Sequence, residues 1–351
     1  MTDDILFSRR GAAGLVTLNR PKALNAVTHG MVLALRAQLE AWAADEAVTR
    51  VIVTAAGERA FSAGGDIRHL YDLGIAGRRA EALQFWRDEY PLNVVIKNFR
   101  KPYVALIDGI VMGGGVGVSV HGSHRVAGDR FSFAMPEVGI GFFPDVGATW
   151  FLPRMPGELG AYCALTGERF GIADAVAAGI ATHRVPSARF PALIEALSGT
   201  VSVDAVLAAF NEPAGQGPLQ ARRAAIDRLF AGDSVENILA ALDRAAASGG
   251  ADADFASKTA ATLRAKSPLS LKIALAQVRR GAHWDFETCM RAEFRIVSRI
   301  IEGRDFYEGV RAVIVDKDNQ PRWSPATLGE ISAAEVERHF SALDNGELEL
   351  P

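Results

Sequence analysis

The chain has 351 residues, of which 49% are hydrophobic and 23% are charged, a composition typical of globular proteins and unlike that of disordered or fibrous chains. Its 38 basic and 41 acidic residues give a net charge of −3, which offers no broad positive field to nucleic acid or to anionic membranes. The two cysteines, Cys163 and Cys289, have neither the number nor the spacing of a disulfide framework or a zinc site. Composition therefore predicts no nucleic-acid partner, no membrane partner and no bound metal.

The first half of the chain alternates short apolar segments with helical patterns. A helix that starts near Thr28 repeats apolar residues at helical spacing, and Asp66 is placed to cap a second helix after a glycine turn. A loop is expected at 74–77 and a long helix at about 79–98, with further short helices near Ala148, Leu159 and Ala173. Strands are predicted at 15–18, 51–54, 103–107, 125–127 and 131–133, with extended chain at 181–185. This order predicts an α/β fold.

Beyond Ser187 the composition changes to alanine-rich helical patterns, interrupted by glycine and proline at 211–218 and by glycines at 249–250. Helices are predicted at about 234–247, 254–267, 269–280, 286–302 and 305–314, and the pair Arg279-Arg280 is interpreted as a solvated helix end. The sequence thus predicts a core domain over residues 1–190 and a helical C-terminal region over residues 191–351.

Two glycine-rich segments, at 61–66 and 112–117, each join a predicted strand to a predicted helix. Such turns let a ligand approach backbone N–H groups, although tight packing is the better explanation of each turn when it is taken alone. A dinucleotide fingerprint would need a further glycine at Val120, and no GxxxxGK[ST] motif occurs, so neither NAD nor ATP is indicated. As a pair, the turns suit an oxyanion hole, in which each of two donors is worth about 3 kcal/mol.

The segment 135–147 is apolar and rich in glycine, and its only ionisable side chains are Glu137 and Asp145. Burial in such surroundings raises the pKa of a carboxyl group and favours acid, base or nucleophile roles. A plain turn role in the Pro-Asp-x-Gly pattern is an equal alternative for Asp145.

These residues carry a family resemblance. The segments 63–67, 113–115, 136–137 and 152–154 resemble the crotonase (enoyl-CoA hydratase/isomerase) superfamily, which implies a ββα superhelix. The segments 89–90, 101–105, 119–122, 133–137, 143–147, 267–272 and 305–312 resemble its 3-hydroxyisobutyryl-CoA hydrolase branch. The branch implies hydrolysis of a short 3-hydroxyacyl-CoA thioester, a step of valine catabolism, without a cofactor, because CoA is part of the substrate.

The resemblance also implies roles for particular residues. The amides of Gly65 and Gly114 would form the oxyanion hole, and Glu137 would act as nucleophile or general base. Asp145 and Glu89 would bind the acyl group at its 3-hydroxyl, or Asp145 would protonate the leaving thiolate. Without the resemblance, Glu89 lies in the run Arg87-Asp88-Glu89, which is typical of a solvated charged helix face.

The CoA moiety is expected near the backbone of Leu24, Asn25 and Ala26 by family analogy. The basic residues Arg20, Lys22 and Lys101 are additional candidates for phosphate contacts, although basic residues in exposed turns are usually only solvated.

Three alternatives stay open. A two-glutamate hydratase would carry a carboxylate two positions after the glycine triplet, where this chain has Gly117, whereas an isomerase or a single-carboxylate hydratase could use Asp145. A non-catalytic RNA-binding relative is disfavoured by the acidic balance.

The acidic start of the chain predicts a cytoplasmic protein, and the family predicts a homo-oligomer.

Overall fold

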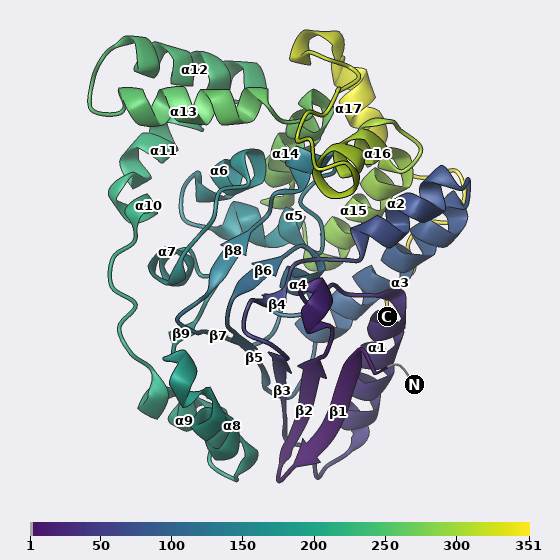
Figure 1. Ribbon diagram of the computed structural model, residues 1–351, viewed down its shortest axis with the longest axis vertical. Helices are drawn as coiled ribbons and strands as arrows, with labels where there is room; N and C mark the ends of the chain where they lie inside the picture. Colours follow the sequence, from purple (N-terminus) through teal and green to yellow (C-terminus); the bar gives the residue numbers. More distant parts are fainter. Residues whose placement is uncertain (1–2) are drawn as a thin grey trace.

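The computed structural model describes residues 3–351 and contains two β-sheets surrounded by helices (Figure 1). A six-stranded sheet has the order β1-β2-β3-β5-β7-β9, and a three-stranded sheet has the order β4-β6-β8. All pairs are parallel except β1 with β2. The strands are β1 (Ile5–Arg10), β2 (Ala13–Leu18), β3 (Arg50–Ala55), β4 (Ala60–Ser62), β5 (Tyr103–Ile107), β6 (Ile110–Met112), β7 (His124–Ala127), β8 (Ser132–Ala134) and β9 (His183–Arg184).

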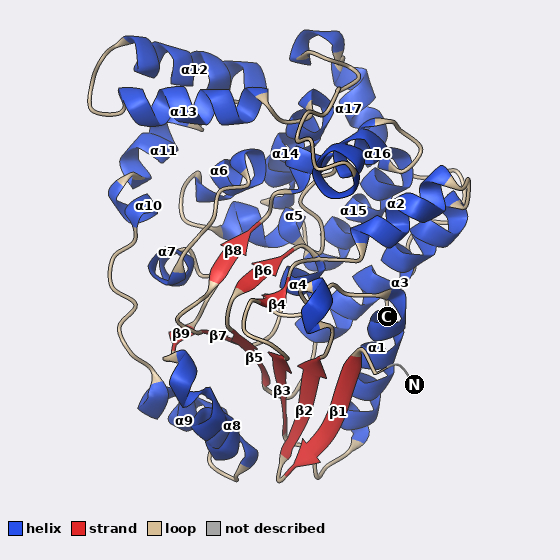
Figure 2. Ribbon diagram, in the orientation of Figure 1, coloured by secondary structure: helices blue, strands red, loops and turns tan. Residues whose placement is uncertain are grey.

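Along the chain, the strands alternate between the two sheets. Each of β3, β5 and β7 in the large sheet is followed within a few residues by β4, β6 or β8 in the small sheet, and helical segments come next (Figure 2). Strand β5 is buried along its whole length, as expected for a parallel strand covered on both faces. This repeat of two strands and a helical segment is the predicted ββα superhelix.

The helices of the first half begin where the sequence indicates. The Thr28 hydroxyl accepts the Met31 N–H at the start of α1, and the Asp66 carboxylate accepts the His69 N–H at the start of α2. Pro91 lies inside α3. These helices are α1 (His29–Ala44), α2 (Ile67–Ile75), α3 (Arg79–Lys97), α4 (Gly114–Gly117), α5 (Ala148–Phe151), α6 (Leu159–Thr166) and α7 (Ile172–Ala177).

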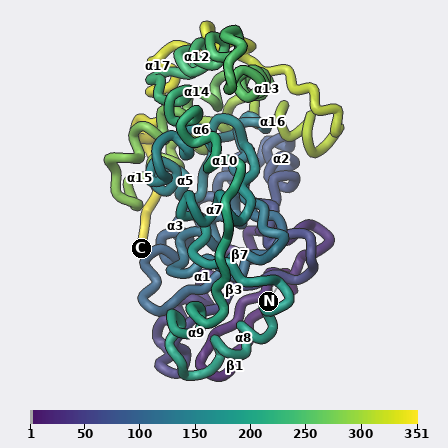
Figure 3. Tube along the Cα trace, turned by 90° about the vertical axis from the view of Figure 1, so that its left-hand side faces the viewer, coloured from purple at the N-terminus to yellow at the C-terminus, as the bar shows by residue number. Residues whose placement is uncertain are grey.

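The second half is helical. Helices α8 and α9 pack on the large sheet, where Leu193, Leu197 and Leu207 meet Ile52 and Val104. From there, the segment with α10 runs along the side of the molecule toward α12 and α13 at the opposite end (Figure 3). The helices are α8 (Phe190–Ser198), α9 (Val203–Phe210), α10 (Pro218–Ala221), α11 (Arg223–Leu229), α12 (Val235–Ala247), α13 (Ala253–Arg264), α14 (Pro268–Gly281), α15 (Phe286–Ile300), α16 (Asp305–Val310) and α17 (Ala333–Phe340).

One hydrophobic core crosses the predicted division near residue 190. Val16 and Leu35 of the first half belong to the same buried cluster as Phe294 and Val297 of α15. Helix α14 contacts α5 and α6, and α15 contacts α3. The division into 1–190 and 191–351 stays a prediction based on composition.

Some local expectations were wrong. Gly74 lies inside α2, not in a loop, because the Tyr307 ring packs where a side chain would be. Arg279 is only partly exposed, and its guanidinium bonds the Glu158 carboxylate at 2.7 Å and the Phe230 carbonyl at 2.7 Å. Both cysteines are free and buried, as expected. Among residues 3–351, no helix has both the length and the apolar character needed to cross a bilayer.

Candidate active site

Two glycine turns meet at the ends of neighbouring strands. Strands β4 and β6 pair in parallel, and each is followed by a glycine with positive φ, +121° at Gly64 and +45° at Gly113. A side-chain carbon on Gly114 would lie 3.2 Å from the Gly65 nitrogen and 2.8 Å from Glu89 Oε1. The close approach of the two turns therefore requires glycine at 114.

The amides of Gly65 and Gly114 are unpaired. Within the part of the chain that the structure describes, neither N–H donates to a protein acceptor. Both residues line one cavity of about 670 Å³. Two unpaired donors beside one cavity can bind a single oxygen on which negative charge develops.

Three buried carboxyl groups line the same cavity. Glu137 opens the 3-10 turn Glu137–Ile140, Asp145 lies in the loop before α5, and Glu89 lies on α3. Their exposed fractions are only 7%, 5% and 1%. The interpretation of Glu89 as part of a solvated charged face was therefore wrong.

The electrostatics of these groups favour their protonated forms. Burial raises the pKa of Glu137 well above its ordinary value, and the charge of Asp145 adds to the effect. Burial, with the charges of Asp145 and Glu293, does the same to the pKa of Glu89. Burial also raises the pKa of Asp145 to about 7, against the hydrogen bond that the Tyr90 hydroxyl donates to it at 3.1 Å. Among the described residues, Glu89 Oε1 and Glu137 Oε2 lack a hydrogen-bond partner.

The segment expected to bind CoA borders this cavity through Leu24 and Ala26. The side chain of Asn25 points into the protein, where its Nδ2 donates to the carbonyls of Ala56 and Ala60 at 2.9 Å each. Leu24 and Asn25 both have positive φ, so these bonds fix an unusual backbone. Asn25 can therefore shape this side of the cavity only through its backbone.

Of the basic candidates, Arg20 lines the cavity, whereas Lys101 is held by the carbonyls of Trp42 and Asp45. The sequence reasoning missed Arg68 and Lys266, which also line the cavity. Lys266 comes from the C-terminal region, and no local pattern marks a residue that tertiary packing brings to a site.

Aromatic side chains form one wall. The rings of Trp86 and Phe142 stack at 5.6 Å between centroids, and both line the cavity. The sequence reasoning gave Trp86 no role. The Tyr90 hydroxyl, which bonds Asp145, was also missed because nothing in its local sequence predicts that partner.

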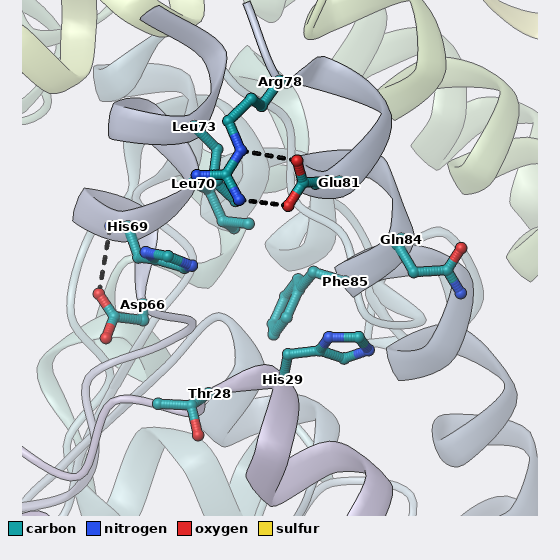
Figure 4. Close-up of a pocket in the computed structure, with 10 residues that line it drawn as sticks. All are labelled: Thr28, His29, Asp66, His69, Leu70, Leu73, Arg78, Glu81, Gln84 and Phe85. Carbon is teal, nitrogen blue, oxygen red and sulfur yellow. Dashed lines mark hydrogen bonds and ion pairs between the residues drawn. The ribbon is translucent and has the colours of Figure 1, made fainter. Parts of the chain in front are cut away.

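A smaller cavity of about 250 Å³ lies between the start of α1, α2 and α3 (Figure 4). It shares Asp66 and Phe85 with the larger cavity. Its charged side chains have partners, because Arg78 bonds Glu81 and Asp66 bonds Arg20. None of the buried carboxyl groups described above lines it.

Comparisons with known proteins agree with this geometry. The family model described as enoyl-CoA hydratase/isomerase matches residues 13–340. A Danio rerio protein named "3-hydroxyisobutyryl-CoA hydrolase, mitochondrial" is 45% identical over 99% of this chain and 92% of its own length. A carnitinyl-CoA dehydratase from Mycobacterium thermoresistibile has a TM-score of 0.92 and 44% identity, with 99% of both chains covered. An enoyl-CoA hydratase from Rhodobacter sphaeroides has the same TM-score and 40% identity over 99% of this chain and 100% of its own.

The superhelix and its cavity place the chain in the class of crotonase-fold enzymes that act on acyl-CoA thioesters. More specifically, the chain belongs to the enoyl-CoA hydratase/isomerase family, whose model covers nearly its whole length. The predicted fold and family are thereby confirmed.

Proposed function

We propose that the chain hydrolyses a short 3-hydroxyacyl-CoA thioester, with 3-hydroxyisobutyryl-CoA as the first candidate, to the free acid and CoA. The observation that carries the proposal is the meeting of Gly65, Gly114 and Glu137 at one cavity. The near full-length similarity to relatives named for this reaction supports the same substrate.

In this mechanism, the amides of Gly65 and Gly114 hold the thioester oxygen as it becomes negatively charged. A carbon added to Gly113 would lie 3.5 Å from Glu137 Oε1, so the Glu137 carboxyl borders the glycine turn. The ionised form of Glu137 attacks the carbonyl carbon, the C–S bond breaks, and the CoA thiolate departs. Water then hydrolyses the mixed anhydride that remains on Glu137. In the alternative route, Glu137 takes a proton from the water that attacks. Rapid quenching and mass spectrometry separate the routes, because only the first forms a covalent adduct on Glu137.

Asp145 and Glu89 would serve the acyl group. A carboxyl group with a pKa near 7 can give a proton at neutral pH, so Asp145 suits protonation of the leaving thiolate. Glu89 Oε1, which lacks a protein partner, suits a hydrogen bond from the 3-hydroxyl of the substrate. If Asp145→Asn hydrolyses the thioester as fast as the wild type, Asp145 does not protonate the leaving thiolate.

The names of the two solved structures suggest hydration or dehydration instead. A two-glutamate mechanism needs a carboxylate at position 117. Here a side-chain carbon on Gly117 would lie 2.8 Å from Asn93 Nδ2 and 3.0 Å from Val146 Cβ. The space for a second glutamate is therefore filled, which favours hydrolysis over two-glutamate water addition.

The deciding experiment measures free thiol released from (S)-3-hydroxyisobutyryl-CoA, with crotonyl-CoA in parallel, by the wild type and by Glu137→Gln. We expect thiol release by the wild type and its loss in the variant. No thiol release, together with a change in the enoyl absorbance of crotonyl-CoA, would overturn the hydrolase and favour the hydratase or isomerase alternative.

We further propose that the reaction needs no cofactor or metal, that the chain forms a homo-oligomer, and that it works in the cytoplasm. Thiol release that survives dialysis against a chelator tests the first point, and sedimentation of the purified protein tests the second. The third point differs from the relatives reported above, which are named as mitochondrial. Cell fractionation of the source organism tests it.

A further inference from the structure

The turn that carries Asp145 has an unfavourable backbone. Val146 has φ +52° and Gly147 has φ +88°, so two consecutive residues lie in the left-handed region. A β-branched residue such as valine rarely adopts this conformation unless its surroundings impose it. Something beyond the turn itself must therefore hold it.

Three buried polar side chains hold this turn from outside. Glu293 on α15 accepts the Gly147 N–H at 2.8 Å through Oε2 and the Thr149 N–H at 2.9 Å through Oε1. Gln277 on α14 donates to the Pro144 carbonyl. His121, which follows α4, has its Nε2 at 2.6 Å from the Val146 carbonyl oxygen. Backbone groups on both sides of Asp145 are thus fixed by distant elements.

We propose that Glu293, Gln277 and His121 form a positioning clamp, which holds the turn so that the Asp145 carboxyl faces the cavity. Glu293 and Gln277 are fully buried and do not line the cavity. The clamp gives the C-terminal helices α14 and α15 a part in catalysis, and it rests on the proposed role of Asp145 in hydrolysis.

The burial and raised pKa of Glu293 support a role in holding the turn. Burial raises its pKa to about 8, the charge of Asp145 adds to this effect, and the two backbone N–H groups act against it. A buried carboxyl group is costly, and an apolar side chain of similar size would serve packing alone. Its two oxygens match two adjacent backbone donors, which a hydrocarbon could not satisfy.

The test compares Glu293→Gln and Gln277→Met with the wild type in thiol release from (S)-3-hydroxyisobutyryl-CoA, per folded molecule. In Glu293→Gln, the amide nitrogen must face one of the two backbone donors, which displaces the turn. We expect kcat to fall about 10- to 100-fold with KM within about twofold, because a small misplacement of a reacting group costs mainly rate.

The matched control is Asp174→Asn. Asp174 is also buried, and it accepts two backbone N–H groups, those of Leu219 at 3.1 Å and Gln220 at 3.3 Å, outside the cavity. Both N–H groups bond Oδ1, so an asparagine keeps an oxygen for them, and the variant should leave kcat unchanged. If Glu293→Gln fails to fold, Gln277→Met decides the question alone.

A double-mutant cycle separates positioning from general stability. If the clamp acts through Asp145, adding Glu293→Gln or Gln277→Met to Asp145→Asn should cost less than about twofold in kcat. A full multiplicative loss in that background, or unchanged kcat in the folded single variants, overturns the inference. A wild type that releases no thiol would instead overturn the proposed function.

Discussion

At the scale of single residues, Gly114 is a position where one added carbon should disturb the oxyanion hole. The carbon would meet Glu89 Oε1 at 2.8 Å and the Gly65 nitrogen at 3.2 Å, so the two glycine turns must separate. We expect Gly114→Ala to reduce thiol release by about 10²- to 10³-fold, the usual effect of losing one oxyanion donor. Steady-state kinetics on 3-hydroxyisobutyryl-CoA measure this loss.

Gly171→Ala is the matched control, because an added carbon there meets no atom within 4 Å and the backbone is extended. It should leave kcat unchanged. Equal activity of Gly114→Ala and Gly171→Ala would argue against an oxyanion hole at this turn.

The raised pKa of Asp145 makes a second prediction, on stability. In the unfolded chain this carboxyl ionises near 3.9, whereas in the folded protein burial raises its pKa to about 7. Between these values the folded state binds a proton that the unfolded state has lost, so the free energy of unfolding falls as pH rises through this window. Asp145→Asn removes the effect and should gain stability relative to the wild type, on the order of a few kcal/mol, between pH 5 and pH 8.

Urea unfolding of both proteins at the two pH values tests this, because titrating groups that do not interact with Asp145 cancel in the difference between them. A difference that stays constant with pH would mean that Asp145 ionises normally in the folded protein.

The sequence predicted the site residues unevenly, and the reason is physical. Glu137 and Asp145 stand out because a lone carboxyl in an apolar, glycine-rich segment is visible in the local sequence. Glu89 does not, because its neighbours Arg87 and Asp88 are charged and only the packing of α3 buries it. The roles of Tyr90 and Glu293 depend on partners 55 and 146 residues away, which no local pattern predicts.

At the scale of helices and strands, caps were predictable because they are local. Thr28, Asp66 and Ser234 each accept an N–H three residues ahead. Strand β1 was missed because most of its residues are partly or fully exposed. In the small sheet, β8 was predicted at 131–133, whereas β4 and β6 were not, because strands of three residues are too short for a clear periodic signal.

The start of helix α15 allows the effect of an N-cap on stability to be measured without a change in the active site. The Asp285 carboxylate accepts the Thr288 N–H at 2.7 Å, and hydrogen bonds from the side chain and the backbone of Thr288 lower the pKa of Asp285. We expect Asp285→Ala to lower the free energy of unfolding by about 1 kcal/mol, with kcat per folded molecule unchanged. Asp285→Asn, which can still cap, should keep most of the stability in denaturant titrations. A loss in Asp285→Asn equal to that in Asp285→Ala would show that the cap is not the cause.

At the scale of the whole molecule, the question is whether residues 1–190 can fold without the helices that follow. Helices α14 and α15 pack on α3, α5 and α6, and Phe294 and Val297 belong to the same buried cluster as Val16. Removing 191–351 would expose that core to water and delete Glu293 and Gln277 from behind the Asp145 turn. Apolar area exposed in this way costs about 25 cal/mol per Å², and a domain is stable by only about 5–15 kcal/mol.

We therefore expect the full chain to lose secondary and tertiary structure in one thermal transition, followed by far- and near-ultraviolet circular dichroism. A fragment of residues 1–190 should show no cooperative melt and no thiol release. Two separate transitions in the full chain, or a fragment that melts cooperatively, would instead mean that the change in composition near Ser187 marks a boundary between independently folding units. Because the core runs through both halves, we expect the substrate cavity to form only in the intact chain.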